Sequence, residues 1–561
     1  MSFLHRQSSI IEEKSDKEAI TSHGVPSSRS GSLKFVSEAG GNDAPSTYQI
    51  ATGAPVEDHS PLGYNVGPIT IIFLNISMMI GTGVYSTPSS VLGGTGSVGL
   101  SMIYWMLGGI ISLSSAAVYL EFTSYFPSRS GAEVVYLEQA FPYPRFFFPT
   151  TYAIQKVIMS FKSSNCIVLA NYLFATAGRT GSNWETKGVA LAGYTVVLLA
   201  VVFHTKYSYY LSNAIGIVKL ITLVFIAVTG LVILGGHTQV PDPKEHFANS
   251  FQGAATPYGI TIALYRIIYS YGGWSNAFNV ANEIKNPVAQ IKRNGTISIL
   301  IVTMLYILAN VAYVAAVGKE KLKDSGTIAA TLFFRAVFGE SRAVQGLNFL
   351  IALSSFGNLL ASMLGAARML RECGRQGVLP CTQFWVSTKP FNTPLGPYLL
   401  DWGLTAIVIL AIPAGDAFNF VADLALYPGA AFSFMAAVGL YIVRRRRSRV
   451  GLPRPQFKAW HPVIIFNILV HLYLLVMPWY PPADGKADVS FWYGTYIVTG
   501  LGILAACGTY YGVWVHAIPR WRGYKLRQLV ADFGNGAQAY KVVKVPVSDV
   551  AEWDATHRPG R

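Results

Sequence analysis

Long apolar stretches separated by short polar segments dominate the chain between residues 67 and 516. Each stretch holds about 20 residues, the length that an α-helix needs to cross a hydrocarbon core of about 30 Å. The pattern predicts twelve transmembrane helices, spans one to twelve, at residues 67–92, 97–122, 146–176, 188–204, 212–235, 256–282, 295–317, 345–372, 398–413, 418–443, 461–480 and 490–516. We therefore expect an all-α polytopic membrane protein.

The two ends of the chain lack this pattern. Residues 1–60 are rich in Ser, Gly, Glu and Lys and contain no apolar run, so they predict a disordered N-terminal tail. Residues 61–518 are expected to form the membrane domain, and residues 519–561 a C-terminal tail. An even number of spans places both tails on one side, and the arginine cluster at 444–449 after span ten predicts that this side is the cytoplasm.

Composition supports a membrane protein and excludes several other classes. The 561 residues are 52% hydrophobic and only 13% charged, against about 25% charged in a typical soluble protein. The net charge of +15 is concentrated in short loops beside apolar segments, which indicates topology signals and contact with the lipid bilayer rather than nucleic-acid binding. The four cysteines have no CxxC spacing, and no catalytic or phosphate-binding motif is present, so we expect no enzyme, metal site or cofactor.

Glycines interrupt two of the predicted spans near their middle. Span one contains Ile80-Gly81-Thr82-Gly83, and span six contains Tyr271-Gly272-Gly273. Breaks at corresponding places in two sets of five spans are typical of an inverted repeat with a central binding site. Here the repeats would be residues 67–235 and 256–443, with spans eleven and twelve at 461–516 outside them. A single Gly-x-Gly more often reflects close helix packing, but the matched pair favours a site.

The chemistry of a broken helix indicates a ligand. Free backbone N–H groups at the start of a half-helix suit a carboxylate, whereas free carbonyl groups at the end of one suit an ammonium group. A molecule carrying both groups on one carbon is an α-amino acid. We therefore expect Gly81, Thr82 and Gly83 to bind the carboxylate, and the carbonyls near Tyr269, Ser270 and Tyr271 to bind the amine.

Several motifs resemble the amino acid–polyamine–organocation superfamily, and in particular its L-type amino acid transporter branch. The resemblance covers about residues 62–545 and includes Gly81-Thr82-Gly83-Val84-Tyr85, Tyr271-Gly272-Gly273-Trp274 and Asn282-Glu283-Ile284-Lys285-Asn286-Pro287. Three later motifs are similar to the fungal high-affinity methionine permease group: Pro413-Ala414-Gly415-Asp416-Ala417-Phe418, Pro478-Trp479-Tyr480-Pro481-Pro482 and Pro519-Arg520-Trp521-Arg522-Gly523-Tyr524-Lys525-Leu526.

The resemblance implies a LeuT-type fold with a 5+5 inverted repeat and broken helices one and six. It implies import of L-methionine or a related neutral L-amino acid across the plasma membrane by alternating access. A broad-specificity permease or exchanger and a non-transporting amino acid receptor are the alternatives. The substrate-binding residues that it implies are Ile80, Gly81, Thr82, Gly83, Asn165, Tyr269, Ser270, Tyr271, Gly272, Gly273 and Tyr427.

Lys219 is a charged residue among apolar neighbours in span five. A lysine in mid-membrane costs about 2.5–3.5 kcal/mol on insertion scales, so it is a candidate functional residue. The resemblance implies that Lys219 occupies the second sodium site of sodium-coupled relatives, with Ser354 and Ser355 as neighbours. It would then replace the ion, or carry the coupling proton of a sodium-independent transporter. A permanently charged structural lysine, bonded to carbonyls of the broken helix, is the other interpretation.

Lys162, near the middle of span three, is a selectivity candidate because the methionine permeases that the chain resembles are apolar there. It either lines the substrate cavity or pairs structurally with a polar neighbour. Glu121, Glu133 and Glu138 fit a family pattern of ion pairs with Arg129, Arg368 or Arg375, and a solvated loop charge is the alternative for Glu138.

Two partner predictions also follow from the resemblance. The loop at residues 178–187 has no cysteine for a disulfide-linked heavy chain, so we expect none. The lysines of the N-terminal tail, Lys14, Lys17 and Lys34, would be targets of ubiquitin-ligase machinery.

Overall fold

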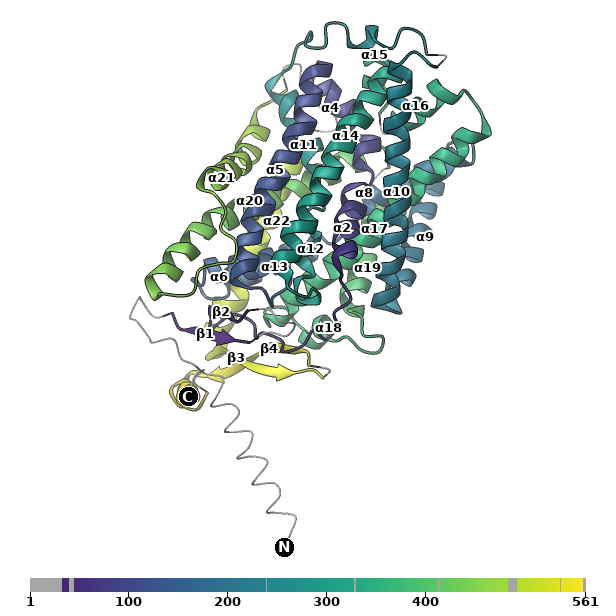
Figure 1. The fold of residues 1–561 in the computed structure, drawn as a ribbon. Helices are drawn as coiled ribbons and strands as arrows, with labels where there is room; N and C mark the ends of the chain where they lie inside the picture. The colour runs from purple at the N-terminus through teal and green to yellow at the C-terminus, as the bar shows by residue number, and fades with distance from the viewer. Residues whose placement is uncertain are drawn as a thin grey trace.

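The computed structural model describes residues 33–39, 45–238, 240–326, 329–411, 414–482, 492–534 and 536–557. Long helices lie side by side in a bundle, and two pairs of short strands cover one end of it (Figure 1). We call this end, which holds β1 (Phe35–Glu38) and β4 (Gln538–Pro546), the terminal end, and the opposite one the far end.

The first half of the bundle contains α2 (Pro68–Met79), α3 (Gly83–Ser86), α4 (Pro88–Thr95), α5 (Val98–Tyr125), α6 (Glu133–Ala140), α7 (Phe147–Ile158), α8 (Ser163–Thr176), α9 (Asn183–Val202) and α10 (Thr205–Leu234). The second half contains α11 (Pro257–Ser270), α12 (Asn276–Asn279), α13 (Pro287–Gln290), α14 (Thr296–Val317), α15 (Lys319–Lys323), α16 (Ala329–Phe338), α17 (Arg342–Arg375), α18 (Thr382–Val386), α19 (Leu395–Ala411) and α20 (Ala414–Val450). The remaining helices are α21 (His461–Val476), α22 (Thr495–Tyr511), α23 (Ile518–Arg522) and α24 (Val550–Thr556).

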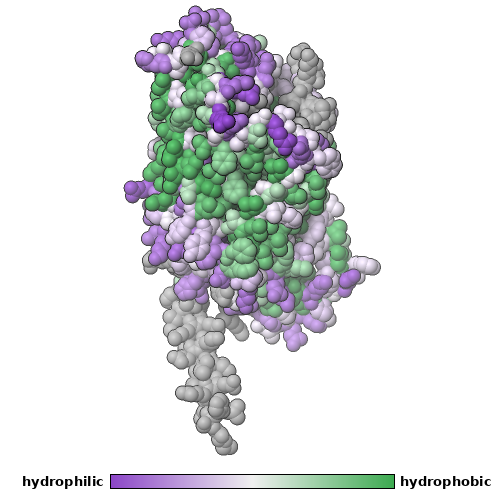
Figure 2. Space-filling view, turned by 90° about the vertical axis from the view of Figure 1, so that its right-hand side faces the viewer, coloured by the Kyte–Doolittle hydropathy of each residue, from purple (hydrophilic) through white to green (hydrophobic). Residues whose placement is uncertain are grey.

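An apolar band crosses the middle of one face of the bundle (Figure 2). Figure 2 shows hydrophobic residues gathered across the centre of one face, with hydrophilic residues towards both ends. On α10, for example, Ile217, Ile221 and Val228 are exposed large apolar side chains. Such a band suits a helix bundle whose surroundings are hydrocarbon rather than water.

Ten segments within the described residues are long and apolar enough to cross a membrane. The two predicted spans that are not among them are spans six and nine. Span six is divided after Ser270, and span nine corresponds to α19, which has 17 residues. The structure is therefore that of a polytopic helical membrane protein.

The helices of spans one and six are both interrupted at their glycine-containing segments, as predicted. The helix of span one ends at Met79 and resumes at Gly83, and that of span six ends at Ser270 and resumes at Asn276. Gly273 has a φ of 125°, a conformation that L side chains rarely adopt.

The two broken spans run side by side in opposite directions. At the terminal end, the N–H of Val66, just before α2, donates to the carbonyl of Glu283 at the end of span six. At the other end of span one, Gly94 lies against Gly259, near the start of α11. The start of each broken span therefore lies beside the end of the other, so the two breaks meet at mid-height.

Span three was predicted as one continuous helix over 146–176, but it too is interrupted. The helix α7 ends at Ile158 and α8 begins at Ser163, with Lys162 in a non-helical conformation before it. No glycine or proline in the sequence marks this interruption. Tertiary hydrogen bonds stabilise it instead: Ser160 Oγ donates to Asp401 Oδ1 at 3.1 Å, and the Lys162 N–H donates to Thr405 Oγ1 at 3.0 Å.

The prediction of disorder up to residue 60 is wrong for the segment that the structure describes before span one. The strand β1 pairs antiparallel with β2 (Thr47–Ile50), and Gln49, Ala54 and Glu57 are buried. The segment gains its order from the helices beneath it, since the Ile50 N–H donates to Gln139 Oε1 at 2.8 Å. Lys14 and Lys17 lie outside the described residues.

The C-terminal tail is also folded within the described residues. The strand β3 (Tyr524–Asp532) and β4 form an antiparallel hairpin, and Tyr540 Oη donates to the Ala51 carbonyl at 3.1 Å. Segments from the two chain ends thus cover the terminal end together.

Candidate functional site

Lys219 satisfies two carbonyl groups that the break in span one exposes. Its Nζ donates to the carbonyl oxygens of Ser77 at 2.6 Å and Ile80 at 2.8 Å. Ser354 Oγ donates to the same Ile80 carbonyl at 3.3 Å, which places Ser354 beside Lys219 as expected. Ser355 instead donates to the Ile351 carbonyl of its own helix. Lys219 is 1% exposed, and a buried carbonyl without a donor would be unfavourable, so the lysine stabilises the broken helix.

Two further side chains bond to the carbonyls at this break. Asn358 Nδ2 on α17 donates to the Met78 carbonyl. Tyr306 Oη on α14 lies 2.5 Å from the Met79 carbonyl and 2.9 Å from the Ser270 carbonyl, and so links the break in span one to the break in span six. The side chains of α10, α14 and α17 therefore replace the bonds that a continuous helix would make.

A chain of hydrogen bonds crosses the bundle beside the breaks. Thr82 Oγ1 donates to Asn165 Oδ1 at 2.8 Å, and Tyr269 Oη donates to the same oxygen at 2.5 Å. Asn165 Nδ2 in turn donates to Asn358 Oδ1 at 2.7 Å. Tyr269 Oη also lies 3.3 Å from Thr82 Oγ1, so its hydroxyl has partners on spans one and three. Spans one, three, six and eight therefore meet at one polar cluster.

A cavity of about 250 Å³ lies between the two breaks. It is lined by Met78, Met79, Gly81, Thr82, Gly83, Met159, Phe161, Lys162, Ser164, Asn165, Ile268, Tyr269, Gly272, Gly273, Asn358, Ser362, Val421, Ala425 and Leu426. One part of the wall is polar backbone and amide groups, and another is thioether and aliphatic side chains. This combination is typical of sites for small molecules with one polar and one apolar end.

Seven of the expected substrate-binding residues line the cavity: Gly81, Thr82, Gly83, Asn165, Tyr269, Gly272 and Gly273. The glycines keep the cavity wall close to its neighbours. A Cβ on Gly83 would lie 2.6 Å from the Cα of Ser270, a backbone atom that cannot move aside easily, and a Cβ on Gly81 would overlap the Asn358 side chain. The two spans can approach this closely only because glycine occupies these positions.

Four expected residues are not part of the cavity wall. The Ile80 carbonyl accepts hydrogen bonds from Lys219 and Ser354. The Ser270 hydroxyl donates to the Arg266 carbonyl at 2.7 Å, and the Tyr271 hydroxyl donates to the Trp105 carbonyl at 2.9 Å.

Tyr427 is the fourth. It was expected to line the substrate site, but its side chain lies on a face of α20 that does not line the cavity. Val421 and Ala425, four residues apart, line the cavity, whereas Tyr427 lies on another face of the helix. Its hydroxyl donates to the Leu475 carbonyl at 3.2 Å.

Lys162 both lines the cavity and lies near a carboxylate. Its Nζ is 3.9 Å from Asp401 Oδ1, and its side chain is 19% exposed. Asp401 also accepts hydrogen bonds from Ser160 and, at 2.9 Å, from Tyr194 Oη. Lys162 thus has a carboxylate neighbour as well as a place in the cavity wall, and its role in selectivity stays a prediction. The carboxylate of Asp401 was missed because α19 gave no sign of facing span three.

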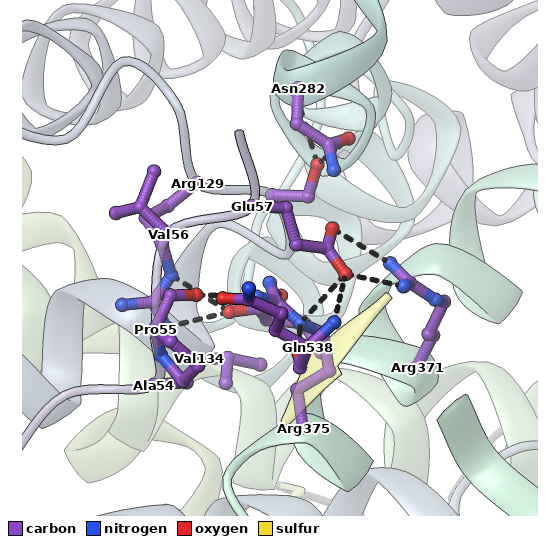
Figure 3. A network of polar contacts seen from close by, with 12 residues as sticks. Ala54, Pro55, Val56, Glu57, Arg129, Val134, Asn282, Arg371, Arg375 and Gln538 are labelled. Atoms are coloured by element: carbon purple, nitrogen blue, oxygen red, sulfur yellow. Dashed lines mark hydrogen bonds and ion pairs between the residues drawn. The ribbon is translucent and has the colours of Figure 1, made fainter. Parts of the chain in front are cut away.

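An ion-pair network closes the terminal end below the cavity (Figure 3). Glu57 points toward Arg371 and Arg375, with Oε1–nitrogen distances of 2.6 and 3.3 Å. Arg375 also pairs with Glu372 at 2.6 Å and donates to the Gln538 carbonyl at 2.8 Å. One carboxylate before span one therefore joins the end of α17 to the C-terminal hairpin.

The same network reaches the loop between spans two and three. Arg129 pairs with Glu372 at 2.6 Å and with Glu138 at 3.3 Å, and it donates to Gln49 Oε1 at 2.7 Å. Burial raises the pKa of Glu138 to about 7, although the charge of Arg129 acts in the opposite direction. The expected Arg129–Glu138 pair is present, whereas Arg368 pairs with Glu283 at 3.0 Å.

Comparison with known proteins identifies the family. Residues 66–503 match the amino acid permease family. The chain is 35% identical to the high-affinity methionine permease of Saccharomyces cerevisiae over 494 residues, which cover 87% of this chain and 86% of that protein. It is 26% identical to the low-affinity methionine permease of the same yeast, covering 87% and 89% of the two chains.

A mouse relative belongs to the L-type branch that the motifs indicated. The chain is 29% identical to the b(0,+)-type amino acid transporter 1 of Mus musculus over 418 residues, which cover 74% of this chain and 82% of that protein. These relatives are transporters and not enzymes. The match covers the membrane domain with both broken spans, and the chain therefore belongs to the amino acid permease family.

Proposed function

We propose that this permease imports L-methionine or a related neutral L-amino acid across the plasma membrane, with both termini in the cytoplasm. It would be a secondary active transporter that is independent of sodium and coupled to protons. The observation that carries the proposal is the cavity at the paired breaks, where the backbone of Gly81, Thr82 and Gly83 lies opposite that of Gly272 and Gly273. Backbone groups freed by two antiparallel breaks suit the two charges of an amino acid.

The cavity wall favours a neutral, apolar side chain. Met78, Met79, Met159 and Ile268 supply adaptable apolar surface, to which a thioether fits well. The positive charge of Lys162 is offset by Asp401, so the wall carries no net charge that would demand an acidic substrate. The two yeast relatives named as methionine permeases support methionine as the first substrate to test.

Lys219 is the proposed coupling residue. Its ammonium group donates to two carbonyls of the break, where a bound cation would otherwise be coordinated, so a sodium ion is not needed there. Its partners are neutral oxygens, and loss of its proton would weaken both bonds. Proton binding would therefore stabilise one arrangement of the break over another, which couples the proton to alternating access.

The proposed architecture is the twelve-span, LeuT-type 5+5 inverted repeat. The support is the antiparallel placement of two broken spans and the cavity between them. Alternating access would rock the helices of spans one and six around that cavity.

The test is uptake of radiolabelled methionine by cells that lack their own permeases, with a panel of competing amino acids and with sodium present or replaced by choline. We expect saturable methionine uptake that sodium removal does not change. Competition by cationic or acidic amino acids as strong as by neutral ones would indicate a broad-specificity permease. Methionine binding without uptake, at normal surface amounts, would indicate a receptor and contradict the proposal.

A further inference from the structure

A buried ion pair connects span six to span ten beside the cavity. Arg266 on α11 meets Asp423 on α20, with an Nη1–Oδ1 distance of 2.6 Å and an Nη2–Oδ2 distance of 3.2 Å. The side chains are 0% and 2% exposed. This two-bond geometry is the strong form of an arginine–carboxylate contact.

The pair lies on the far-end flank of the cavity. Arg266 precedes the cavity residue Tyr269 by three residues, which is about one helical turn. Because α11 runs from the far end to the break, Arg266 is farther from the terminal end than Tyr269. On α20, Asp423 lies at the height of the cavity residues Val421 and Ala425, on the neighbouring face that it shares with Tyr427.

The helices that carry the two residues have different main packing partners. The helix α11 packs chiefly against α4 and α5, which are parts of spans one and two. The helix α20 packs chiefly against α21, α6, α22 and α8, and only lightly against α11 itself. A movement of α11 with spans one and two relative to α20 would therefore strain or break the Arg266–Asp423 contact.

Stability alone does not account for such a pair. Two ions buried together gain little over well-packed apolar residues, because their desolvation offsets their attraction. Ionisable residues inside a membrane are unfavourable and usually mark function. The Ser270 hydroxyl donates to the carbonyl of Arg266, so the pair is connected through the backbone to the break itself.

We propose that the Arg266–Asp423 pair is a latch that holds the outer half of span six against span ten over the bound substrate, and that it opens and closes once in each transport cycle. The inference rests on the transport function proposed above. Arg266 and Asp423 are then positioning residues, which act through α11 and Tyr269 and do not contact the substrate.

The experiment measures access to the cavity from outside the cell. Ala425→Cys supplies a thiol on the exposed, cavity-lining face of α20, and a membrane-impermeant maleimide labels it on intact cells. Asp423→Asn removes the negative charge of the pair. The double variant Arg266→Asp with Asp423→Arg exchanges the positions of the two charges. Glu185→Gln is the matched control, because it removes the exposed Arg179–Glu185 pair, whose nitrogen–oxygen distance is 2.9 Å.

For Asp423→Asn we expect faster labelling by about fivefold, maximal methionine uptake lowered about tenfold and a KM within about threefold of the original, because closure and not binding is impaired. The charge-reversed double variant should recover slow labelling and part of the uptake. Should Asp423→Asn not reach the surface, this double variant decides, since it retains a pair. Glu185→Gln should change none of these quantities.

Two results would overturn the latch. One is an unchanged labelling rate in an Asp423→Asn variant that reaches the surface. The other is a charge-reversed variant that reaches the surface but labels as fast as the neutral one. Absence of methionine binding and uptake in the unmodified protein would instead contradict the proposed function, so the two failures are distinguishable.

Discussion

At the centre of the bundle, the polar groups exposed by the helix breaks are neutral carbonyls, and single side chains such as Lys219, Tyr306 and Asn358 bond to them. At the terminal end, ions pair with ions: Arg129, Arg371 and Arg375 meet Glu57, Glu138 and Glu372. Space differs as well, with a cavity of about 250 Å³ at the centre and one of about 20 Å³ beside Glu138.

The two regions therefore differ in the strength of their polar contacts. A hydrogen bond between neutral groups contributes about 1 kcal/mol, and one from a charged donor such as Lys219 about 1.5–3 kcal/mol. Removing one member of a buried ion pair leaves an unmatched charge and is far less favourable. In this structure buried ion pairs therefore hold the terminal end together below the cavity.

The largest effect is expected at the centre, from Gly83→Ala. The added Cβ would lie 2.6 Å from the Ser270 backbone and push the two breaks apart. We expect methionine uptake to fall by about 100-fold, the scale seen when reacting groups are displaced by about 1 Å. Gly508→Ala is the matched control, since a Cβ there meets nothing within 4 Å.

Uptake by Gly83→Ala within a few-fold of the control, at equal surface amounts, would remove the carboxylate role from this segment. Equal loss in both variants would show a general intolerance of alanine for glycine rather than a site.

The next effect is expected in the terminal network, from Glu57→Gln. Glu57 is the shared partner of Arg371 and Arg375, both buried, so its neutralisation should lower the free energy of unfolding by about 3–5 kcal/mol. Thermal unfolding of the purified protein followed by tryptophan fluorescence measures the change. Asp554→Asn breaks the partly exposed pair with Arg527 and should lower it by at most about 1 kcal/mol. Similar unfolding midpoints for both variants would show that the ion-pair network does not stabilise the terminal end.

The smallest effect is a pH dependence at Glu138. Burial raises the pKa of this carboxyl from 4.5 to about 7, so between these values the folded protein binds the proton that the unfolded chain has lost. The contribution of Glu138 to stability is therefore full below pH 4.5 and is lost as the pH rises through about 7. The thermal midpoint should fall more from pH 5 to pH 8 in the unmodified protein than in Glu138→Gln. Parallel slopes would contradict a raised pKa of Glu138.

Local patterns were sufficient to predict the ten long apolar segments and both central breaks, because hydrophobic length and mid-span glycine are properties of the sequence itself. They were insufficient wherever a distant partner decides the structure. The interruption before Ser163 depends on Asp401 and Thr405, and β1 is ordered by helices far along the chain.

For the site, backbone positions were easier to predict than side-chain directions. Gly81, Gly83 and Gly273 lie where expected because only glycine allows the approach. Tyr427 does not, since a shift of two residues along α20 turns a side chain to another face. The Arg266–Asp423 pair was not predicted because the two residues are 157 positions apart, and nothing in the local sequence of either one indicates the other.

The most direct test of proton coupling through Lys219 compares methionine uptake by the unmodified protein and by Lys219→Ala at pH 5 and pH 7, with and without sodium. We expect uptake that is higher at pH 5 and unaffected by sodium in the unmodified protein, and lower and independent of pH in the variant. A Lys219→Ala variant that reaches the surface and keeps the same rise in uptake at pH 5 would contradict the assignment of proton coupling to Lys219.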